Sequence, residues 1–207
     1  MNEHLLSIVL FTPLAGLLVL LFLPASNKNL IRVWANFSAI AGFLVSLPLV
    51  FRFDKSNGGF QYLERYDWIP TLGVKYAVGI DGISLLLVML TTLTGVIAIF
   101  ASWSSIDEHV KQYSAMFLLQ QAGMIGVFLA LDFFLFYVFW ELVLVPMYFI
   151  IGVWGGPRKL YAAIKFFLYT LAGSVLMLLG ILALYLQGGT FDMLALSKAD
   201  LPASFQW

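Results

Sequence analysis

Two ionisable residues interrupt the most apolar part of the sequence, and both can carry protons. Glu141 is the one charged residue in the run 133–156, and Lys165 is the one charged residue in the run 160–186. A charged group in hydrocarbon costs about 2.5–3.5 kcal/mol on insertion scales, so a carboxyl group there pairs with a cation or holds its proton. A buried lysine gives up its proton readily. Both side chains are therefore predicted to take part in proton transfer.

The residues around Glu141 support this chemistry. Tyr137 lies four residues before it and Tyr148 seven after it, so a helix places all three on one face. Pro146 cannot donate a backbone hydrogen bond, which leaves the Leu142 carbonyl in need of a polar side chain or water. A polar, hydrated pocket is predicted beside Glu141. The alternative is a structural glutamate that ties two helices together.

Lys165 lies seven residues after Arg158, or about 10 Å from that end of its helix. Tyr161 and Tyr169 flank it at four residues on either side. At this depth the lysine stem does not reach the interface with ease, which favours a role in proton transfer. The alternative is an anchor whose side chain curls back toward the lipid headgroups.

The elements that position these residues are predicted to be membrane-spanning helices. Of the 207 residues, 62% are hydrophobic and 11% are charged, against about 25% charged in a soluble domain. A spanning helix needs about 20 mostly apolar residues. The sequence predicts an all-α, polytopic helix bundle that forms a single membrane domain over 1–207, with about six transmembrane helices at 5–23, 30–51, 82–106, 112–131, 133–156 and 160–186.

The fourth and fifth spans are separated at Asp132, although no glycine or proline marks the break. Residues 112–157 are too long for one crossing of a hydrocarbon core about 30 Å thick, and an aspartate at a helix start caps free N–H groups. Gly123 and Gly126 of the fourth span are predicted to allow close helix packing.

Two segments are predicted outside the membrane. The loop 52–81 combines glycine, proline, charges of both signs and aromatic residues that include Tyr62, Tyr66 and Trp68. This composition indicates an ordered extramembrane segment with its aromatics at headgroup level. Asp81 is expected to cap the helix that follows. The segment 188–207 is predicted to be an amphipathic C-terminal linker.

The N-terminus is predicted to lie outside the membrane. The run 5–23 lacks a basic segment before it and exceeds a signal-peptide core in length, so it is interpreted as a span. Cytoplasmic loops are rich in lysine and arginine, and short loops weigh most. The shortest basic turn, Pro157-Arg158-Lys159, is therefore assigned to the cytoplasmic side.

Several classes of site are excluded by composition. The chain has no cysteine, which excludes disulfides, thiolate metal sites and iron–sulfur ligation on it. His4 and His109 are far apart in sequence and make a poor metal pair, so no metal or cofactor is predicted on this chain. The net charge is zero, which argues against nucleic-acid binding.

Three stretches resemble a known family. They are 79–85 (GIDGISL), 136–156 (FYVFWELVLVPMYFIIGVWGG) and 162–174 (AAIKFFLYTLAGS). Together they resemble the proton-pumping, antiporter-like subunits of complex I, NADH:quinone oxidoreductase, and most closely the subunit M (chain 4) branch. By this resemblance Glu141 corresponds to the essential intramembrane glutamate of the family, and Lys165 to the lysine of the next helix.

The resemblance also implies a larger protein. Family members have about fourteen spans, and this sequence resembles their N-terminal portion. The segment 188–207 then corresponds to the linker before a seventh, broken helix, whose lysine is expected to pair with Glu141.

The function implied is proton translocation coupled to quinone reduction elsewhere in the complex. NADH, flavin, iron–sulfur clusters and quinone would be used by the parent complex. The implied partners are the other membrane subunits, including homologous antiporter-like ones, and the implied location is a bacterial-type inner membrane. The alternatives are a subunit of a multi-subunit cation/proton antiporter, a membrane subunit of an energy-converting hydrogenase, and a purely structural anchor.

Overall fold

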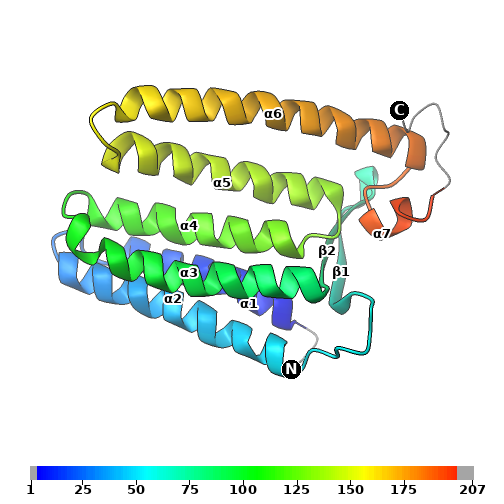
Figure 1. The fold of residues 1–207 in the computed structure, drawn as a ribbon, viewed down its shortest axis with the longest axis horizontal. Coiled ribbons are helices and arrows are strands. Elements are labelled where there is room, and N and C mark those ends of the chain that lie inside the picture. Colours follow the sequence, from blue (N-terminus) through cyan, green and yellow to red (C-terminus); the bar gives the residue numbers. More distant parts are fainter. Residues whose placement is uncertain (1–3, 200–207) are drawn as a thin grey trace.

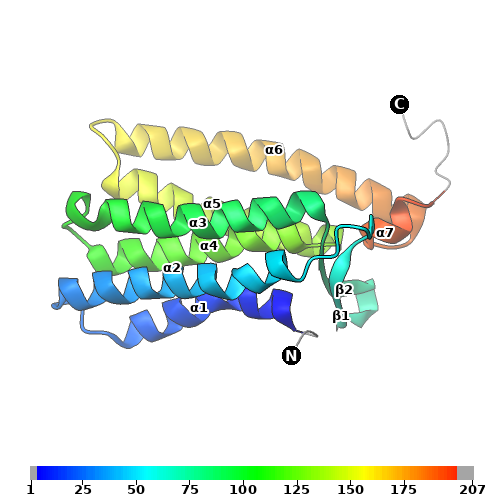
Figure 2. The same cartoon turned by 60° about the horizontal axis from the view of Figure 1, so that its bottom comes forward.

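A computed structural model describes residues 4–199, and their six long helices run antiparallel in chain order. Turns at 23–27, 106–109 and 155–158 gather at one end of the bundle, which we call the loop end (Figure 1). A β-hairpin covers the other end, the hairpin end, and both views agree on this (Figures 1 and 2). The long helices are α1 (Leu5–Phe22), α2 (Lys28–Phe51), α3 (Gly82–Ser105), α4 (Val110–Leu129), α5 (Phe133–Trp154) and α6 (Lys159–Gly188).

Five of these helices are long and apolar enough to cross a membrane, and the sixth, α4, is more polar. Ten of the twenty residues of α4 are buried, and the helix packs against α1, α2, α3 and α5. A helix enclosed by protein can carry polar side chains, such as Gln121, because lipid does not face them.

The glycines of α4 bring α5 close, as the sequence predicts. A Cβ atom at Gly126 would collide with the ring of Phe139, and one at Gly123 would lie 2.8 Å from Val143 Cγ2. Substituting either glycine would push α5 away from α4, and α5 carries Glu141.

The segment between α2 and α3 forms strands that the sequence analysis does not predict. Strand β1 (Gln61–Ile69) pairs antiparallel with β2 (Val74–Ile80), with Tyr66 opposite Tyr76. A 3-10 turn (Pro70–Leu72) joins them. The Leu131 amide donates to the Ala77 carbonyl at 2.8 Å, so β2 holds the break between α4 and α5 in place.

Carboxylates stand at the N-terminal ends of the helices that begin at the hairpin end. Asp81 and Asp132 cap α3 and α5, which confirms both predicted caps. Asp192 caps the short helix α7 (Met193–Leu196), which follows α6 in the predicted linker; residues 200–207 of that linker lie outside the described residues. For α1 the carboxylate comes from β1, since Glu64 accepts hydrogen bonds from the amides of Leu6 (2.8 Å) and Ser7 (3.1 Å).

Cations close the C-terminal ends of the same helices at the loop end. The Lys111 ammonium donates to the Leu21 and Leu23 carbonyls at 2.8 and 2.7 Å, at the end of α1. Lys159 donates to the Val153 carbonyl at the end of α5 at 2.6 Å. Positive charge is favourable at a helix C-terminus because the backbone dipoles point their negative ends there.

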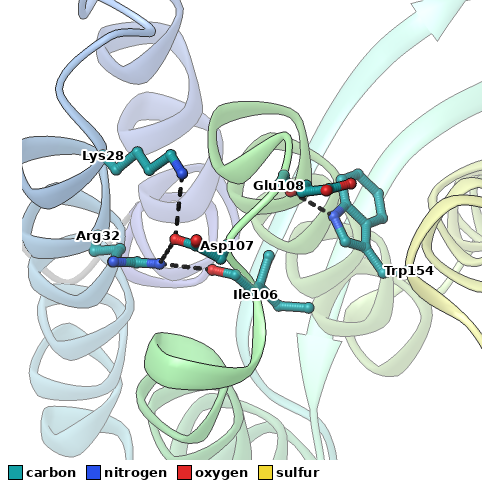
Figure 3. Close-up of polar contacts among 6 residues, drawn as sticks. All are labelled: Lys28, Arg32, Ile106, Asp107, Glu108 and Trp154. Carbon is teal, nitrogen blue, oxygen red and sulfur yellow. Dashed lines mark hydrogen bonds and ion pairs between the residues drawn. The ribbon is translucent and has the colours of Figure 1, made fainter.

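The end of α3 is held in the same way (Figure 3). Arg32 of α2 donates to the Ile106 carbonyl at 2.7 Å and pairs with Asp107 at 3.2 Å, where Lys28 also arrives at 3.2 Å. The hydrogen bond from Lys28 and the nearby positive charges lower the pKa of Asp107 below its usual value. The Trp154 indole donates to the Glu108 carbonyl at 2.8 Å, which joins α5 to this turn.

Candidate functional site

Glu141 lies in the middle of α5. In the row of helices, α5 lies between α4 and α6 (Figure 1). Glu141 is eight residues from the first residue of α5 and thirteen from the last, or about 12 and 20 Å. Its Oε1 atom is buried and has no hydrogen-bond partner among residues 4–199. An unpaired carboxylate oxygen is costly in hydrocarbon, so this position suits a group that gains and loses a proton.

The side of α5 that faces α6 carries the polar neighbours of Glu141. Tyr137 lies next to both Glu141 and Ser174 of α6. Ser174 is buried, and its hydroxyl donates to the Leu171 carbonyl at 3.1 Å. Ser174 is not among the predicted site residues, although a serine that follows a glycine and precedes an apolar run could have marked it.

The other residues predicted around Glu141 extend the same face toward the loop end. Tyr148 meets the ring of Phe167 on α6, with ring centres 5.4 Å apart, and Pro146 is buried within α5. Tyr137 and Tyr148 thus both contact α6, with Glu141 between them along the helix. The neighbouring cavity of about 230 Å³, between α4, α5 and α6, is lined by apolar side chains apart from Thr170. Glu141 does not line this cavity, so the polar pocket expected beside Glu141 stays a prediction.

Lys165 lies on α6 with its side chain exposed. Its Nζ atom is 5.8 Å from the centre of the Tyr161 ring, which is a cation–π distance. Tyr169, the other predicted neighbour, is 83% exposed. Lys165 lines an open groove of about 480 Å³ near the loop end, together with Ile151 and residues 156–159.

Glu141 and Lys165 lie at different depths in the bundle. Glu141 of α5 approaches one side of α6, and Lys165 projects from the other side of α6. Lys165 precedes Ser174 by nine residues, which is about 13 Å along the axis and two and a half turns around it. Because Tyr137 joins Glu141 to Ser174, Lys165 is nearer the loop end and faces the other way. Among the described residues the two charges form no ion pair.

Charged residues at the hairpin end were not predicted to be buried. Asp132 is fully buried, and it accepts hydrogen bonds from the amides of Phe134, Leu135 and Lys75. Burial raises the pKa of Asp132 above its usual value. Asp192 is 8% exposed and pairs with Arg65 at 3.1 Å.

Within residues 4–199, no group of three histidine, aspartate or glutamate side chains could hold a metal ion.

Comparisons with known proteins identify a family for this chain. Residues 130–206 match the family described as NADH:quinone oxidoreductase/Mrp antiporter, TM. The chain is 46% identical over 206 residues to NADH-quinone oxidoreductase subunit M of Rhodobacter capsulatus, covering 97% of this chain and 39% of the relative. It is also 46% identical over 189 residues to NADH-ubiquinone oxidoreductase chain 4 of Arabidopsis thaliana, covering 91% of this chain and 38% of that one. The chain thus spans about two fifths of the length of these relatives.

Solved structures show the same fold. A chain of respiratory complex I from Thermus thermophilus superposes with a TM-score of 0.83 at 27% identity, covering 99% of this chain and 40% of that chain. A chain of the Mrp complex from Dietzia sp. superposes with a TM-score of 0.78 at 19% identity, covering 96% of this chain and 21% of that chain.

Proposed function

Because this chain belongs to the antiporter-like membrane family of NADH:quinone oxidoreductase and Mrp antiporters, we propose that it is part of a proton-translocating membrane subunit of respiratory NADH:quinone oxidoreductase. The observation that carries the proposal is the buried, unpartnered Oε1 atom of Glu141 halfway along α5. A carboxyl group in that position accepts a proton from one side of the membrane and releases it to the other.

The neighbouring residues position this carboxyl group. Tyr137 and Ser174 supply hydroxyl groups on the α6 side of Glu141, and they can orient it or pass a proton to it. Lys165 is too far from Glu141 to pair with it directly, so its positive charge acts on proton affinity at a distance. NADH, flavin, iron–sulfur clusters and quinone belong to the parent complex, whose other membrane subunits are the partners of this one.

The subunit is placed in a bacterial-type inner membrane with its loop end toward the cytoplasm. The loop end gathers Lys28, Arg32, Lys111, Arg158 and Lys159 on short turns and helix starts. Short basic segments stay on the cytoplasmic side during insertion. The hairpin end and the N-terminus then lie outside.

A subunit of an Mrp-type cation/proton antiporter is the second candidate. Its support is the shared fold, with a TM-score of 0.78 to the Dietzia chain. The identity of 46% to subunit M favours the oxidoreductase, since the Mrp chain shares only 19%.

The test is Glu141→Gln in the full-length protein within its complex. Proton uptake by inside-out vesicles is measured per NADH oxidised, and assembly is followed on native gels. Pumping should fall to a small fraction of wild type with the complex assembled, because glutamine cannot titrate. Glu141→Asp should keep part of the activity, because it keeps a carboxyl group with a shorter reach.

The matched control is Glu108→Gln, which neutralises a carboxyl group on the turn at the loop end and keeps the backbone carbonyl that Trp154 contacts. It should pump like wild type. Near-normal pumping by an assembled Glu141→Gln complex would refute the role of Glu141. Cation-driven proton exchange that persists without NADH would instead support the antiporter.

A further inference from the structure

A second group of buried polar side chains lies on α2, α3 and α4, whereas Glu141 and Lys165 lie on α5 and α6. We call this group, together with Arg32 and Ser102 at its loop end, the polar seam. Each of its buried members has at most 8% of its surface exposed, although this part of the molecule is otherwise apolar. The buried members are Asn36, Ser46, Thr91, Thr92, Ser114 and Gln121.

The seam begins near the loop end in a small cavity. Arg32 and Asn36 of α2, Ser102 of α3 and Ser114 of α4 line this cavity. About 10 Å³ of it is open to the centre of a water molecule, which is room for about one water. Two atoms of its lining, Arg32 Nε and Asn36 Oδ1, are buried without a hydrogen-bond partner among the described residues.

The seam continues deeper between the same helices. Gln121 lies seven residues after Ser114 on α4 and is fully buried, and its amide packs directly on Gly95 of α3. Three residues from Gly95 toward the hairpin end, the Thr92 hydroxyl lies 3.1 Å from the Ser46 hydroxyl of α2. Because α3 is antiparallel to α4, Ser114, Gln121 and Thr92 follow one another toward the hairpin end. They span about 15 Å along the helix axes.

Gln121 is the strongest sign that this line has a ligand. Both its Nε2 and its Oε1 are buried, and neither has a hydrogen-bond partner among residues 4–199. A buried polar atom left without a partner costs about 1–3 kcal/mol. In a bundle enclosed by lipid, bulk water does not relieve this cost at the helix surface. Internal water, which makes about three hydrogen bonds to such groups, does.

We propose that the polar seam binds internal water molecules at two levels, where they complete the hydrogen bonds of Arg32 and Asn36 in the cavity near the loop end and those of Gln121 at mid-depth. Both levels lie between α2, α3 and α4, away from Glu141 and Lys165 on α5 and α6. Water is the ligand that fits, because the orphaned groups are both donors and acceptors and the cavity near the loop end has room for about one water molecule.

The first test uses the absence of cysteine from the chain. Ser114→Cys and Thr92→Cys place a thiol in the seam, at the level of the cavity and at the deeper level. Ala115→Cys and Val88→Cys are the controls, since both positions are buried in apolar clusters of the same helices. The full complex, in its membrane, is transferred to D2O, and the S–H stretching band of each variant is followed by infrared difference spectroscopy against the unsubstituted complex.

Both seam thiols should exchange at least tenfold faster than the control thiols, because exchange requires contact with water. Exchange at either seam position that is as slow as at its control would overturn the proposal.

The second test replaces Gln121 itself. The expected change in Tm has opposite signs for a seam that contains water and for one that does not. Gln121→Met keeps the shape of the side chain and removes both orphaned atoms. If water completes their hydrogen bonds, the substitution removes the partners of that water and lowers the Tm of the full-length protein. If the amide is dry, the substitution removes two unpaired atoms and raises the Tm, which would overturn the proposal. Gln120→Met, at the adjacent and half-buried position, is the control and should change the Tm little.

Discussion

Replacing Glu64 by alanine should loosen the start of α1, although Glu64 lies 58 residues away from Leu6 in sequence. Glu64 is 3% exposed, and it accepts hydrogen bonds from the Leu6 amide, the Ser7 amide and the Ser7 hydroxyl. The Ser7 hydroxyl also lies 2.7 Å from the Tyr76 hydroxyl, which ties β2 into the same contact. Alanine removes the acceptor and leaves two amides of the first helical turn unpaired.

The size of the effect follows from these contacts. Loss of an N-cap acceptor costs about 1 kcal/mol, and a hydrogen bond to a charged group contributes about 1.5–3 kcal/mol. We expect the free energy needed to open the first turn of α1 to fall by about 2–3 kcal/mol. Since 1.36 kcal/mol is a factor of ten, the Leu6 and Ser7 amides should exchange with solvent deuterium roughly 30- to 150-fold faster.

The assay is hydrogen–deuterium exchange with mass spectrometry on the peptide that covers the start of α1, in the full-length protein. Glu64→Gln should give a smaller change, because it keeps one acceptor oxygen and loses the charge. Asp54→Ala is the control, since Asp54 is exposed and bonds to Ser56 within its own loop. Unchanged protection of α1 in Glu64→Ala would show that the reasoning is wrong, as would a loss of protection confined to the hairpin.

Two further predictions concern the charged groups and the topology. Lys165→Ala should reduce proton pumping less than Glu141→Gln, because Lys165 acts at a distance; a pH–activity profile identical to wild type would favour an anchor role instead. Single cysteines at Ser56 and Ser197 should react with an impermeant thiol reagent on intact cells, and one at Ser105 should not, because the first two lie at the hairpin end and the third at the loop end. The reverse labelling would invert the orientation, and labelling of both 56 and 105 would mean that α3 does not cross.

Local signals in the sequence located the long helices well. Apolar runs predict helix boundaries that differ by two residues or fewer from those in the structure, as for α4 (112–131 predicted, Val110–Leu129 found). The caps at Asp81 and Asp132 were also predictable, because a capping residue and the amides that it binds are only two or three residues apart.

Features that depend on distant segments could not be predicted in this way. The strands of the hairpin pair with each other, and the aromatics at 62, 66 and 68 equally fit a loop at the membrane interface. The burial of Glu64 depends on where β1 crosses the start of α1. The separation of Glu141 from Lys165 depends on the register of α5 against α6, which the contact between Tyr137 and Ser174 reveals and periodicity within one helix does not.

The two ends of α1 are completed by residues that the ribosome adds much later. Glu64 follows Leu6 by 58 residues, and Lys111 follows Leu21 by 90. At about 5–20 residues per second, α1 waits roughly 5–20 s after its own synthesis for the cation that closes its C-terminal carbonyls. During that time its ends depend on water and lipid headgroups, which leaves α1 free to tilt or shift in the bilayer. The first helix to enter the membrane is thus held at both ends only once α4 has begun, and its final depth is set by β1 and α4.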